Sequence, residues 1–246
     1  MKTQYIHGIH AVKSALKYDP TTIQEIVVDK RRSDDKSNAI IGAAKKAGVT
    51  VSRRDKKELD KLADGENHQG VIAVSAGSKP KGDKELTDFI QQLEHNPFLL
   101  ILDGVQDPHN LGACLRTANA AGVDAVIIPK DKAVGMTSVV HKVSCGASHV
   151  IPVFQITNLA RTMKSLQKEG VWIIGTAGET EQSYLDVDFK GSVAVVMGAE
   201  GEGMRRLTKE ACDFLVKISM EGVVESLNVS VATGVVLFEA KRQRAS

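Results

Sequence analysis

From Pro97 onward, the sequence repeats short and almost wholly apolar runs that are separated by helix-like segments. The runs expected to form strands are Phe98–Leu102, Ala125–Ile128, Val150–Val153, Val171–Ile174, Val193–Met197 and Phe214–Ile218. Strands of this kind need helices on both faces, so the pattern predicts an α/β fold with a mainly parallel sheet. Ligands of such sheets bind beyond the carboxyl ends of the strands, so the functional site is expected in the loops that follow them.

A smaller α/β unit precedes this region. Its expected strands and helices are a helix around residues 11–16, strands Ile23–Val28, Val49–Val51 and Gly70–Val74, and helices over residues 33–47 and 55–63. Residues 75–83 are rich in Gly, Ser, Pro and Lys, which is typical of a linker, and a helix is expected at 84–94. We therefore expect an N-terminal domain at 1–75, a linker and connecting helix at 76–96, and a catalytic domain at 97–246.

Composition indicates a soluble, cytoplasmic protein. Apolar residues make up 42% and charged residues 25% of the 246 residues, which excludes disorder as the main state. No run approaches the roughly 18 apolar residues of a membrane-spanning helix, and no signal peptide is recognisable. Cys114, Cys145 and Cys212 are widely spaced and form no Cys-x-x-Cys pair, so we expect buried, reduced thiols.

The formal net charge of +2 is unevenly distributed. Residues 1–74 carry a net +4 and residues 75–246 a net −2. Basic clusters lie at 30–32, 45–46 and 53–57. Such clusters either follow a phosphate backbone or are solvated surfaces, and charge alone does not decide between the two.

Three segments that follow expected strands stand out. The first contains Asn110 and Arg116 on a helix of small residues that ends before Gly122. A guanidinium there either lies along the helix surface or binds a phosphate through its planar fork. The small residues would allow this helix to pack closely on a sheet or on another subunit.

The second segment, Met197–Met204, contains three glycines in the order G-x-x-G-x-G. This is not the order of a dinucleotide-binding loop, and the carboxylates of Glu200 and Glu202 would repel phosphates, so a nicotinamide-dependent oxidoreductase is disfavoured. The third segment, Ser226–Asn228, opens a helix that continues to residue 238, and either polar residue could simply be a helix cap.

Taken together, the three segments resemble the SpoU/TrmH family of RNA 2′-O-ribose methyltransferases in the SPOUT superfamily. The matching residues are 110–118, then 198–203 with Glu200, then 226–232. The motifs at 7–12 and 67–71 look like that family's small, ribosomal-protein-like substrate-binding domain. The resemblance thus covers nearly the whole chain, and it is strongest to the branch that methylates a guanosine ribose in 23S rRNA.

The resemblance, rather than the residue pattern, implies several further features. The catalytic sheet would carry a deep trefoil knot, which is rare and which no connection rule predicts. S-adenosyl-L-methionine would bind in the knot at Gly198, Ile218 and Leu227, and the protein would act as a homodimer.

The resemblance also implies catalytic roles for Arg116, Asn110, Glu200, Ser226 and Asn228. A guanidinium has a pKa above about 12 and is a poor base, so we expect Arg116 to hold the substrate phosphate, with the general base left open. Asn110, Ser226 and Asn228 would orient the ribose, and Glu200 would position the arginine or the loop beside the cofactor. His7, His10, His68 and His109 have no metal-ligand spacing, and no metal is expected.

Two alternatives to methylation of large-subunit ribosomal RNA remain at this point. A ribosome-assembly factor without catalytic activity would be expected to lack Arg116 or the Gly198 loop, and both are present. Transfer RNA is the other possible substrate. Members of the family that act on transfer RNA typically lack a globular domain before the catalytic one, so residues 1–75 favour ribosomal RNA.

Overall fold

A computed structural model describes residues 3–76 and 81–245. The chain forms two compact units: unit 1 comprises Met1–Lys79 and Ser138–Val150, and unit 2 comprises Pro80–Thr137 and Ile151–Ser246. Unit 1 therefore includes a segment that the sequence boundaries assign to the catalytic domain, and unit 2 includes the connecting helix. The linker expected at 75–83 overlaps residues 77–80, which lie outside the described residues.

Unit 1 is built on a four-stranded sheet in the order β1-β4-β2-β3. Its strands are β1 (Gln4–His7), β2 (Ile23–Asp29), β3 (Thr50–Arg54) and β4 (Val71–Ser75). The pair β2 and β3 is parallel, whereas β4 is antiparallel to both β1 and β2. The short strand β1 was not expected from the sequence.

Three helices of unit 1 cover the two faces of this sheet. They are α1 (Ile9–Tyr18), α2 (Asp35–Lys46) and α3 (Lys56–Ala63). Apolar residues of α1 and α2 pack with Ile26 and Val28 on one face, and Leu59 of α3 packs with Val27 and Ile72 on the other. The alternation of side chains along β2 thus supplies both layers of the core.

The second segment of unit 1 contains α6 (Ser138–Val143) and a 3-10 turn at Ala147–His149. It is anchored by an ion pair between Lys142 Nζ and Glu66 Oε2 at 2.8 Å. The imidazole rings of His141 and His149 stack with centroids 5.0 Å apart. Gly146 has a φ of +95°, and a Cβ there would lie 2.5 Å from the hydroxyl of Ser14, so this close approach requires glycine.

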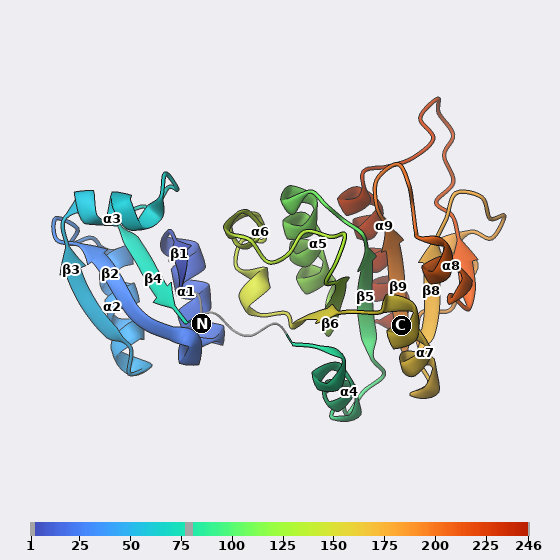
Figure 1. The fold of residues 1–246 in the computed structure, drawn as a ribbon, viewed down its shortest axis with the longest axis horizontal. Coiled ribbons are helices and arrows are strands. Elements are labelled where there is room, and N and C mark those ends of the chain that lie inside the picture. The colour runs from blue at the N-terminus through green and yellow to red at the C-terminus, as the bar shows by residue number, and fades with distance from the viewer. Residues whose placement is uncertain (1–2, 77–80, 246) are drawn as a thin grey trace. The chain divides into compact units, whose positions relative to one another are not determined.

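Unit 2 contains a six-stranded, wholly parallel sheet in the order β10-β8-β9-β5-β6-β7. Its strands are β5 (Phe98–Asp103), β6 (Ala125–Pro129), β7 (Val153–Ile156), β8 (Trp172–Thr176), β9 (Val193–Gly198) and β10 (Phe214–Val216). The predicted parallel α/β architecture is confirmed, with a smaller α/β unit that includes the N-terminal residues (Figure 1).

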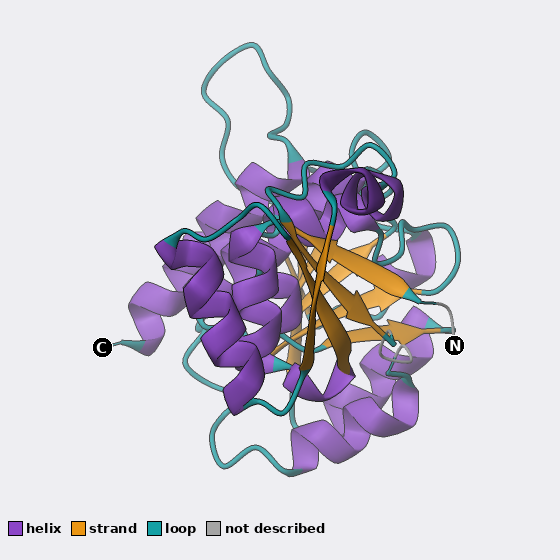
Figure 2. Ribbon diagram, turned by 90° about the vertical axis from the view of Figure 1, so that its left-hand side faces the viewer, coloured by secondary structure: helices purple, strands orange, loops and turns teal. Residues whose placement is uncertain are grey.

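Helices flank the strands, as Figure 2 shows. Those of unit 2 are α4 (Asp83–Gln91), α5 (Pro108–Ala121), α7 (Leu159–Lys168), α8 (Arg206–Glu210) and α9 (Val229–Arg244). Apolar residues of α4 and α7 join those of the strands in one buried cluster. Helices α5 and α9 pack against each other, and α9 also contacts β9. Among the described residues, no helix combines the length and apolar character that a membrane crossing requires.

Two expectations about local structure are wrong. The strand expected at Val150–Val153 begins only at Val153, because Pro152 has no N–H to donate and the preceding residues form the 3-10 turn. Cys145 is exposed rather than buried, whereas Cys114 is fully buried and Cys212 is partly buried. Among the described residues, none of the three cysteines forms a disulfide.

Candidate active site

A cavity of about 520 Å³ lies where the carboxyl ends of three adjacent strands meet the start of α9. The loops after β8, β9 and β10 and the residues around the start of α9 form its walls: 176–179, 197–203, 216–218, 220, 225–229 and 232. Six of the eight site residues expected from the sequence line it, namely Gly198, Glu200, Ile218, Ser226, Leu227 and Asn228. Its volume lies in the range of roughly 300–1,000 Å³ that is usual for small-molecule sites.

The glycines of the loop after β9 serve a tight turn. The main chains of Ala199 and Gly203 exchange two hydrogen bonds, both of 3.0 Å. A Cβ at Gly198 would lie 2.3 Å from the main-chain carbon of Gly203 and the nitrogen of Met204, so no side chain fits there. Gly201 and Gly203 have φ values of +78° and +68°. The turn carries the exposed Glu200 at the cavity, which explains a glycine spacing that does not suit a dinucleotide.

Three polar residues from distant parts of the chain form one hydrogen-bonded cluster. Glu200 Oε1 accepts hydrogen bonds from Asn110 Nδ2 at 2.8 Å and from Asn228 Nδ2 at 2.5 Å. Asn228 Nδ2 also lies 3.1 Å from Asn110 Oδ1, to which it donates. The cluster joins α5, the turn after β9 and the start of α9, and thereby holds the first, second and third motif segments together.

Ser230 was not expected from the sequence, and it orients this cluster. Asn228 caps α9: its Oδ1 accepts from the main chain of Ser230 at 2.9 Å and from the Ser230 hydroxyl at 2.6 Å. With Oδ1 engaged in this way, the amide nitrogen of Asn228 is directed to Glu200. The helix-cap interpretation of Asn228 is therefore confirmed, and its role in a functional site stays a prediction.

Asp103, another residue that the sequence analysis did not select, anchors the loop after β9. Its side chain is fully buried at the end of β5. It accepts hydrogen bonds from the main chain of Arg205 at 2.8 Å and from Arg205 Nε at 2.6 Å. A charged residue at the end of an otherwise apolar strand was the available signal, since a buried carboxylate needs a partner.

Arg116 lies on α5, six residues after Asn110, and its side chain is exposed. Among the described residues that line the cavity, Arg116 does not appear. Six residues of helix correspond to a rise of about 9 Å, so the guanidinium starts well away from the Asn110 amide along the helix axis. The structure thus brings seven of the eight expected residues together at the cavity and its edge, and it leaves Arg116 outside the lining.

Cys114 lies on α5 between Asn110 and Arg116 but has no properties of a nucleophile. Its thiol is buried and contacts the hydroxyl of Thr233 at 3.6 Å, which in turn donates to the carbonyl of Val229 at 2.6 Å. Burial, assisted by the carboxylate of Glu200, raises the pKa of Cys114 to about 11. The thiol stays protonated and serves the packing of α5 on α9.

The histidines that stood out in the sequence lie outside the cavity lining. His109 is exposed in the first turn of α5, and its main chain donates to the cap Asp107 at 2.8 Å. His68 is buried, and its Nδ1 accepts from the Gly70 main chain while its Nε2 lies 2.9 Å from Asp60. Among the described residues, no group of three or more His, Cys, Asp or Glu could hold a metal ion.

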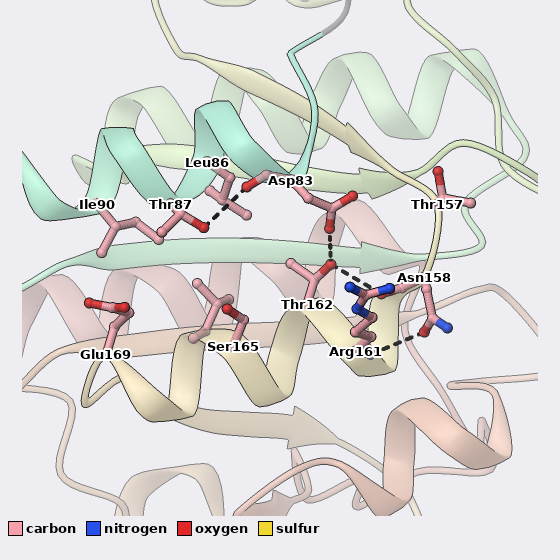
Figure 3. Close-up of a pocket in the computed structure, with 11 residues that line it drawn as sticks. Asp83, Leu86, Thr87, Ile90, Thr157, Asn158, Arg161, Thr162, Ser165 and Glu169 are labelled. Carbon is pink, nitrogen blue, oxygen red and sulfur yellow. Dashed lines mark hydrogen bonds between the residues drawn. The ribbon is translucent and has the colours of Figure 1, made fainter.

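A second hollow, of about 450 Å³, lies between α4 and α7 (Figure 3). Its polar groups bond one another: the Thr162 hydroxyl donates to Asp83, and the Thr87 hydroxyl donates to the Asp83 carbonyl at 3.2 Å. Among its described lining residues there is none of the expected site residues. It is a groove between two packed helices, and the motif residues select the cavity at the strand ends.

Comparison with known families identifies the chain. The SpoU rRNA Methylase family matches residues 97–238, and a second family, described as RNA 2'-O ribose methyltransferase substrate binding, matches residues 5–81. The chain belongs to the SpoU rRNA methylase family. The resemblance inferred from the three motif segments is thereby confirmed, as is the expectation of an RNA 2′-O-ribose methyltransferase.

Relatives in the SpoU rRNA methylase family match the chain along its whole length. The 23S rRNA (guanosine-2'-O-)-methyltransferase RlmB of Photobacterium profundum is 54% identical over 244 residues, covering 99% of each chain. The protein of the same name from Vibrio vulnificus is 52% identical, covering 99% of this chain and 98% of its own. The SpoU methyltransferase AviRb from Streptomyces viridochromogenes, solved in complex with AdoMet, has the same fold: its TM-score is 0.82 at 20% identity, over 99% of this chain and 91% of that chain.

Proposed function

We propose that this protein transfers a methyl group from S-adenosyl-L-methionine to the 2′-oxygen of a guanosine ribose in 23S rRNA. The observation that carries the proposal is the identity of 52–54% over the full chain to 23S rRNA (guanosine-2'-O-)-methyltransferases. The meeting of the three motif segments at one cavity supports it further. A ribosomal RNA substrate supports the further proposal that the protein acts in the cytoplasm of a bacterial cell.

The residues of the cavity fit S-adenosyl-L-methionine. Gly198 ends β9, and Ile218 and Leu227 lie in the segment between β10 and α9. All three line the cavity, and they would hold the cofactor through main-chain groups and apolar side chains. When bound, the cofactor supplies a methyl group on a positively charged sulfur. The carboxylates of Glu179, Glu200 and others at this edge suit a cation, whereas they would repel a phosphate.

The cluster of Asn110, Glu200 and Asn228 would orient the ribose. Its internal hydrogen bonds fix the amide groups before the substrate arrives, and preorganised groups lower the cost of reaching the reactive geometry. Ser226 is exposed at the cavity wall, where its hydroxyl can hydrogen-bond a ribose. Through this cluster Glu200 fixes the loop beside the cofactor.

Arg116 would hold a phosphate of the substrate RNA and stabilise the negative charge that develops on the 2′-oxygen. Its place outside the cavity lining and its exposure suit a contact with a polymer rather than with the cofactor. A guanidinium keeps its proton, so Arg116 acts as a phosphate ligand and the base that removes the hydroxyl proton is a different group.

We also propose that the protein is a homodimer and that its catalytic domain contains a trefoil knot. On α9, Val231 and Phe238 are 52% and 48% exposed, and they are about two turns apart, so they lie on the same face of the helix. Exposed apolar side chains of this kind are usual at subunit interfaces.

The proposal of a knot is supported by contacts of the C-terminal helix. Near the C-terminus, Gln243 and Arg244 hydrogen-bond main-chain groups of residues 187–191, which lie between β8 and β9.

The proposed function is tested by incubating the protein with labelled S-adenosyl-L-methionine and, separately, unmodified 23S rRNA and transfer RNA. The labelled ribose is then mapped. We expect one labelled guanosine in 23S rRNA. Labelling of transfer RNA alone would contradict the proposal that 23S rRNA is the substrate. If neither RNA is labelled although RNA still binds, an assembly factor without catalytic activity would be favoured.

The coverage of solved structures also favours ribosomal RNA over transfer RNA as the substrate. Two solved structures whose names refer to the modification of transfer RNA match only 66% and 60% of this chain.

A further inference from the structure

Unit 1 has a pocket of its own, of about 550 Å³, at the carboxyl ends of the parallel strands β2 and β3. Two loops and a helix start form it: the loop from β2 to α2, the loop that leads into β4, and the first residue of α3. Its lining residues are Asp29, Arg31, Arg32, Ser33, Asp34, Lys56 and Gly70. We name it the Arg31 pocket.

The main chain around the Arg31 pocket is held rigidly. Arg31 donates its N–H to Asp29 Oδ1 at 2.9 Å, and Arg32 donates its N–H to the Asp29 carbonyl at 3.0 Å. From β3, Arg53 Nη1 donates to the carbonyl of Arg32 at 3.2 Å. The loop that carries the two arginines is therefore ordered before any ligand binds, which lowers the entropic cost of binding.

The carboxylates of the pocket are already engaged by the protein itself. Asp34 accepts from the Ser37 main chain at 2.9 Å and from Arg32 Nε at 2.5 Å, and these contacts lower the pKa of Asp34. Asp29 accepts from the main chain of Arg31. The acidic groups that could neutralise a ligand-binding cation are thus committed to holding the loops.

Two cations remain open. Among residues 3–76 and 81–245, no group hydrogen-bonds or ion-pairs with the guanidinium of Arg31 or the ammonium of Lys56, and both side chains are exposed. Arg32 lies against the main chain of Gly70: a Cβ there would come within 3.0 Å of Arg32 Cδ and 3.2 Å of Nη1. Gly70 is therefore needed both for its φ of +74° and for the space that Arg32 occupies.

The chemistry of these groups matches a phosphodiester. A guanidinium fork bonds two phosphate oxygens at once, and an ammonium supplies a further charge. Among the described residues that line the pocket, none is an aromatic or large aliphatic residue that could enclose a base or sugar. Arg31, Ser33, Asp34 and Lys56 are exposed, so a chain could enter and leave on either side of the bound phosphate. These features favour the backbone of a nucleic acid over a free nucleotide.

We infer that the Arg31 pocket binds a backbone phosphate of the RNA substrate. This inference rests on the proposed function for the identity of the RNA. Phosphate contacts carry no sequence information but fix position and raise affinity. Arg31 and Lys56 would thus set the affinity for RNA and leave the chemistry at the other unit unchanged.

The test compares two double variants of the full-length protein. Arg31→Ala/Lys56→Ala removes the two open cations, and Lys45→Ala/Lys46→Ala removes the same charge from exposed positions on α2. The dissociation constant for a 23S rRNA fragment is measured by fluorescence anisotropy at several salt concentrations. We expect the pocket variant to bind about tenfold more weakly and to lose roughly 0.7 from the slope of log K against log salt, since contact with one phosphate of a single strand contributes about 0.7. The control should match the wild type.

Three further measurements keep the outcomes separate. S-adenosyl-L-methionine affinity and the circular dichroism spectrum should be unchanged in both variants, which shows that the fold is intact; a pocket variant that fails this check is replaced by Arg31→Ala alone. At saturating RNA the pocket variant should retain its kcat and show a raised KM. Equal RNA affinity and salt slope in the two double variants would overturn the inference, whereas absence of methyl transfer to rRNA by the wild type would overturn the proposed function.

Discussion

The two units present carboxyl strand ends of opposite charge. In unit 1, β2 and β3 are followed by Lys30, Arg31, Arg32 and Lys56. In unit 2, the cavity at the strand ends includes Glu179, Glu200, Glu202 and Glu225. Parallel strands place their following loops at one edge in both cases, so topology decides where a ligand binds. The side chains decide which ligand: a polyanion suits the first edge and a sulfonium cation suits the second.

This contrast explains how a chain with a net charge of only +2 can act on RNA. If charge were evenly distributed, phosphate binding would be weak and cations would lie near the positively charged cofactor. Both effects are avoided because the exposed cations Arg31 and Lys56 are concentrated in unit 1 and carboxylates are concentrated at the cavity of unit 2. Lys217 also lines this cavity but is paired with Glu181, whereas Arg116, on α5, is the cation proposed to contact the RNA and gives the strongest test.

Replacing Arg116 by alanine is expected to have the largest effect. If Arg116 stabilises charge at the substrate, its loss should lower kcat for rRNA methylation by about 10²–10³-fold, the range for removing one such group. Arg161→Ala, which removes an exposed arginine on α7 at the groove of Figure 3, is the matched control and should retain activity. Cofactor affinity should stay the same in both. Full methyl transfer by Arg116→Ala would remove the residue from the mechanism.

The turn after β9 is the next test, because it forms the acidic edge. In Gly198→Ala the new Cβ would overlap the main chain of Gly203 and Met204, which cannot move aside as a side chain could. Overpacking of this kind costs about 1–3 kcal/mol, so cofactor affinity should fall roughly 5- to 150-fold by calorimetry. Gly178→Ala is a control in the same cavity, because a Cβ there meets nothing within 4 Å. Equal affinities for the two variants would show that the turn does not shape the cofactor site.

The sequence predicted some features of the strand-end sites in the two units and not others. The apolar runs predicted the parallel sheet, and the rule for strand ends predicted where the cavity would lie. The partners of Glu200 could not be derived, because Asn110 and Asn228 lie 90 and 28 residues away and local patterns carry no information about long-range pairing. Only the family resemblance placed the three together. Asp103 and Ser230 were missed because they act by holding other residues.

Unit 1 shows the same limit. The basic clusters at 30–32 and 53–57 were visible, but whether they were solvated or arranged as a site was not. The arrangement of these basic residues depends on Gly70, whose missing side chain leaves space for Arg32. It also depends on Asp29 and Asp34, which accept hydrogen bonds from groups of the same loop. The packing of Ser138–Val150 into unit 1 was also beyond reach, since nothing in that segment distinguishes one hydrophobic surface from another.

Gly70 allows the basic edge to be tested without changing a charge. In Gly70→Ala the φ of +74° costs about 1–2 kcal/mol, and the Cβ displaces Arg32. Gly48→Ala has a similar φ of +71° but meets no atom within 4 Å, so it shares the strain and not the displacement. We expect both variants to melt earlier by thermal unfolding, and only Gly70→Ala to raise the KM for rRNA by a few fold. A raised KM in both would assign the effect to strain.

The two units should also differ in their response to acid. In unit 1, burial, together with the neighbouring His149, lowers the pKa of His141 from 6.5 to about 4. Burial also lowers the pKa of His149 and of His7. Glu66 and Lys142, which both act on His7, pair with each other. Above pH 6.5 the histidines are neutral in both the folded and the unfolded state, so their contribution to stability is fully present.

As the pH falls from 6.5 toward 4, the unfolded segment takes up protons that the folded one excludes, so the stability of Ser138–Val150 should decrease across this window. Hydrogen exchange of its amides, corrected for the intrinsic pH dependence, should quicken, while exchange in β9 stays the same. His141→Asn keeps a hydrogen-bonding group near Ser148, which His141 contacts at 2.9 Å, but cannot be protonated there. In this variant, amide hydrogen exchange of Ser138–Val150 should depend less on pH than in the wild type. Replacing the exposed His10 by glutamine should leave the pH dependence of that exchange unchanged. An identical pH profile in wild type and His141→Asn would show that acid acts on this segment through groups other than His141.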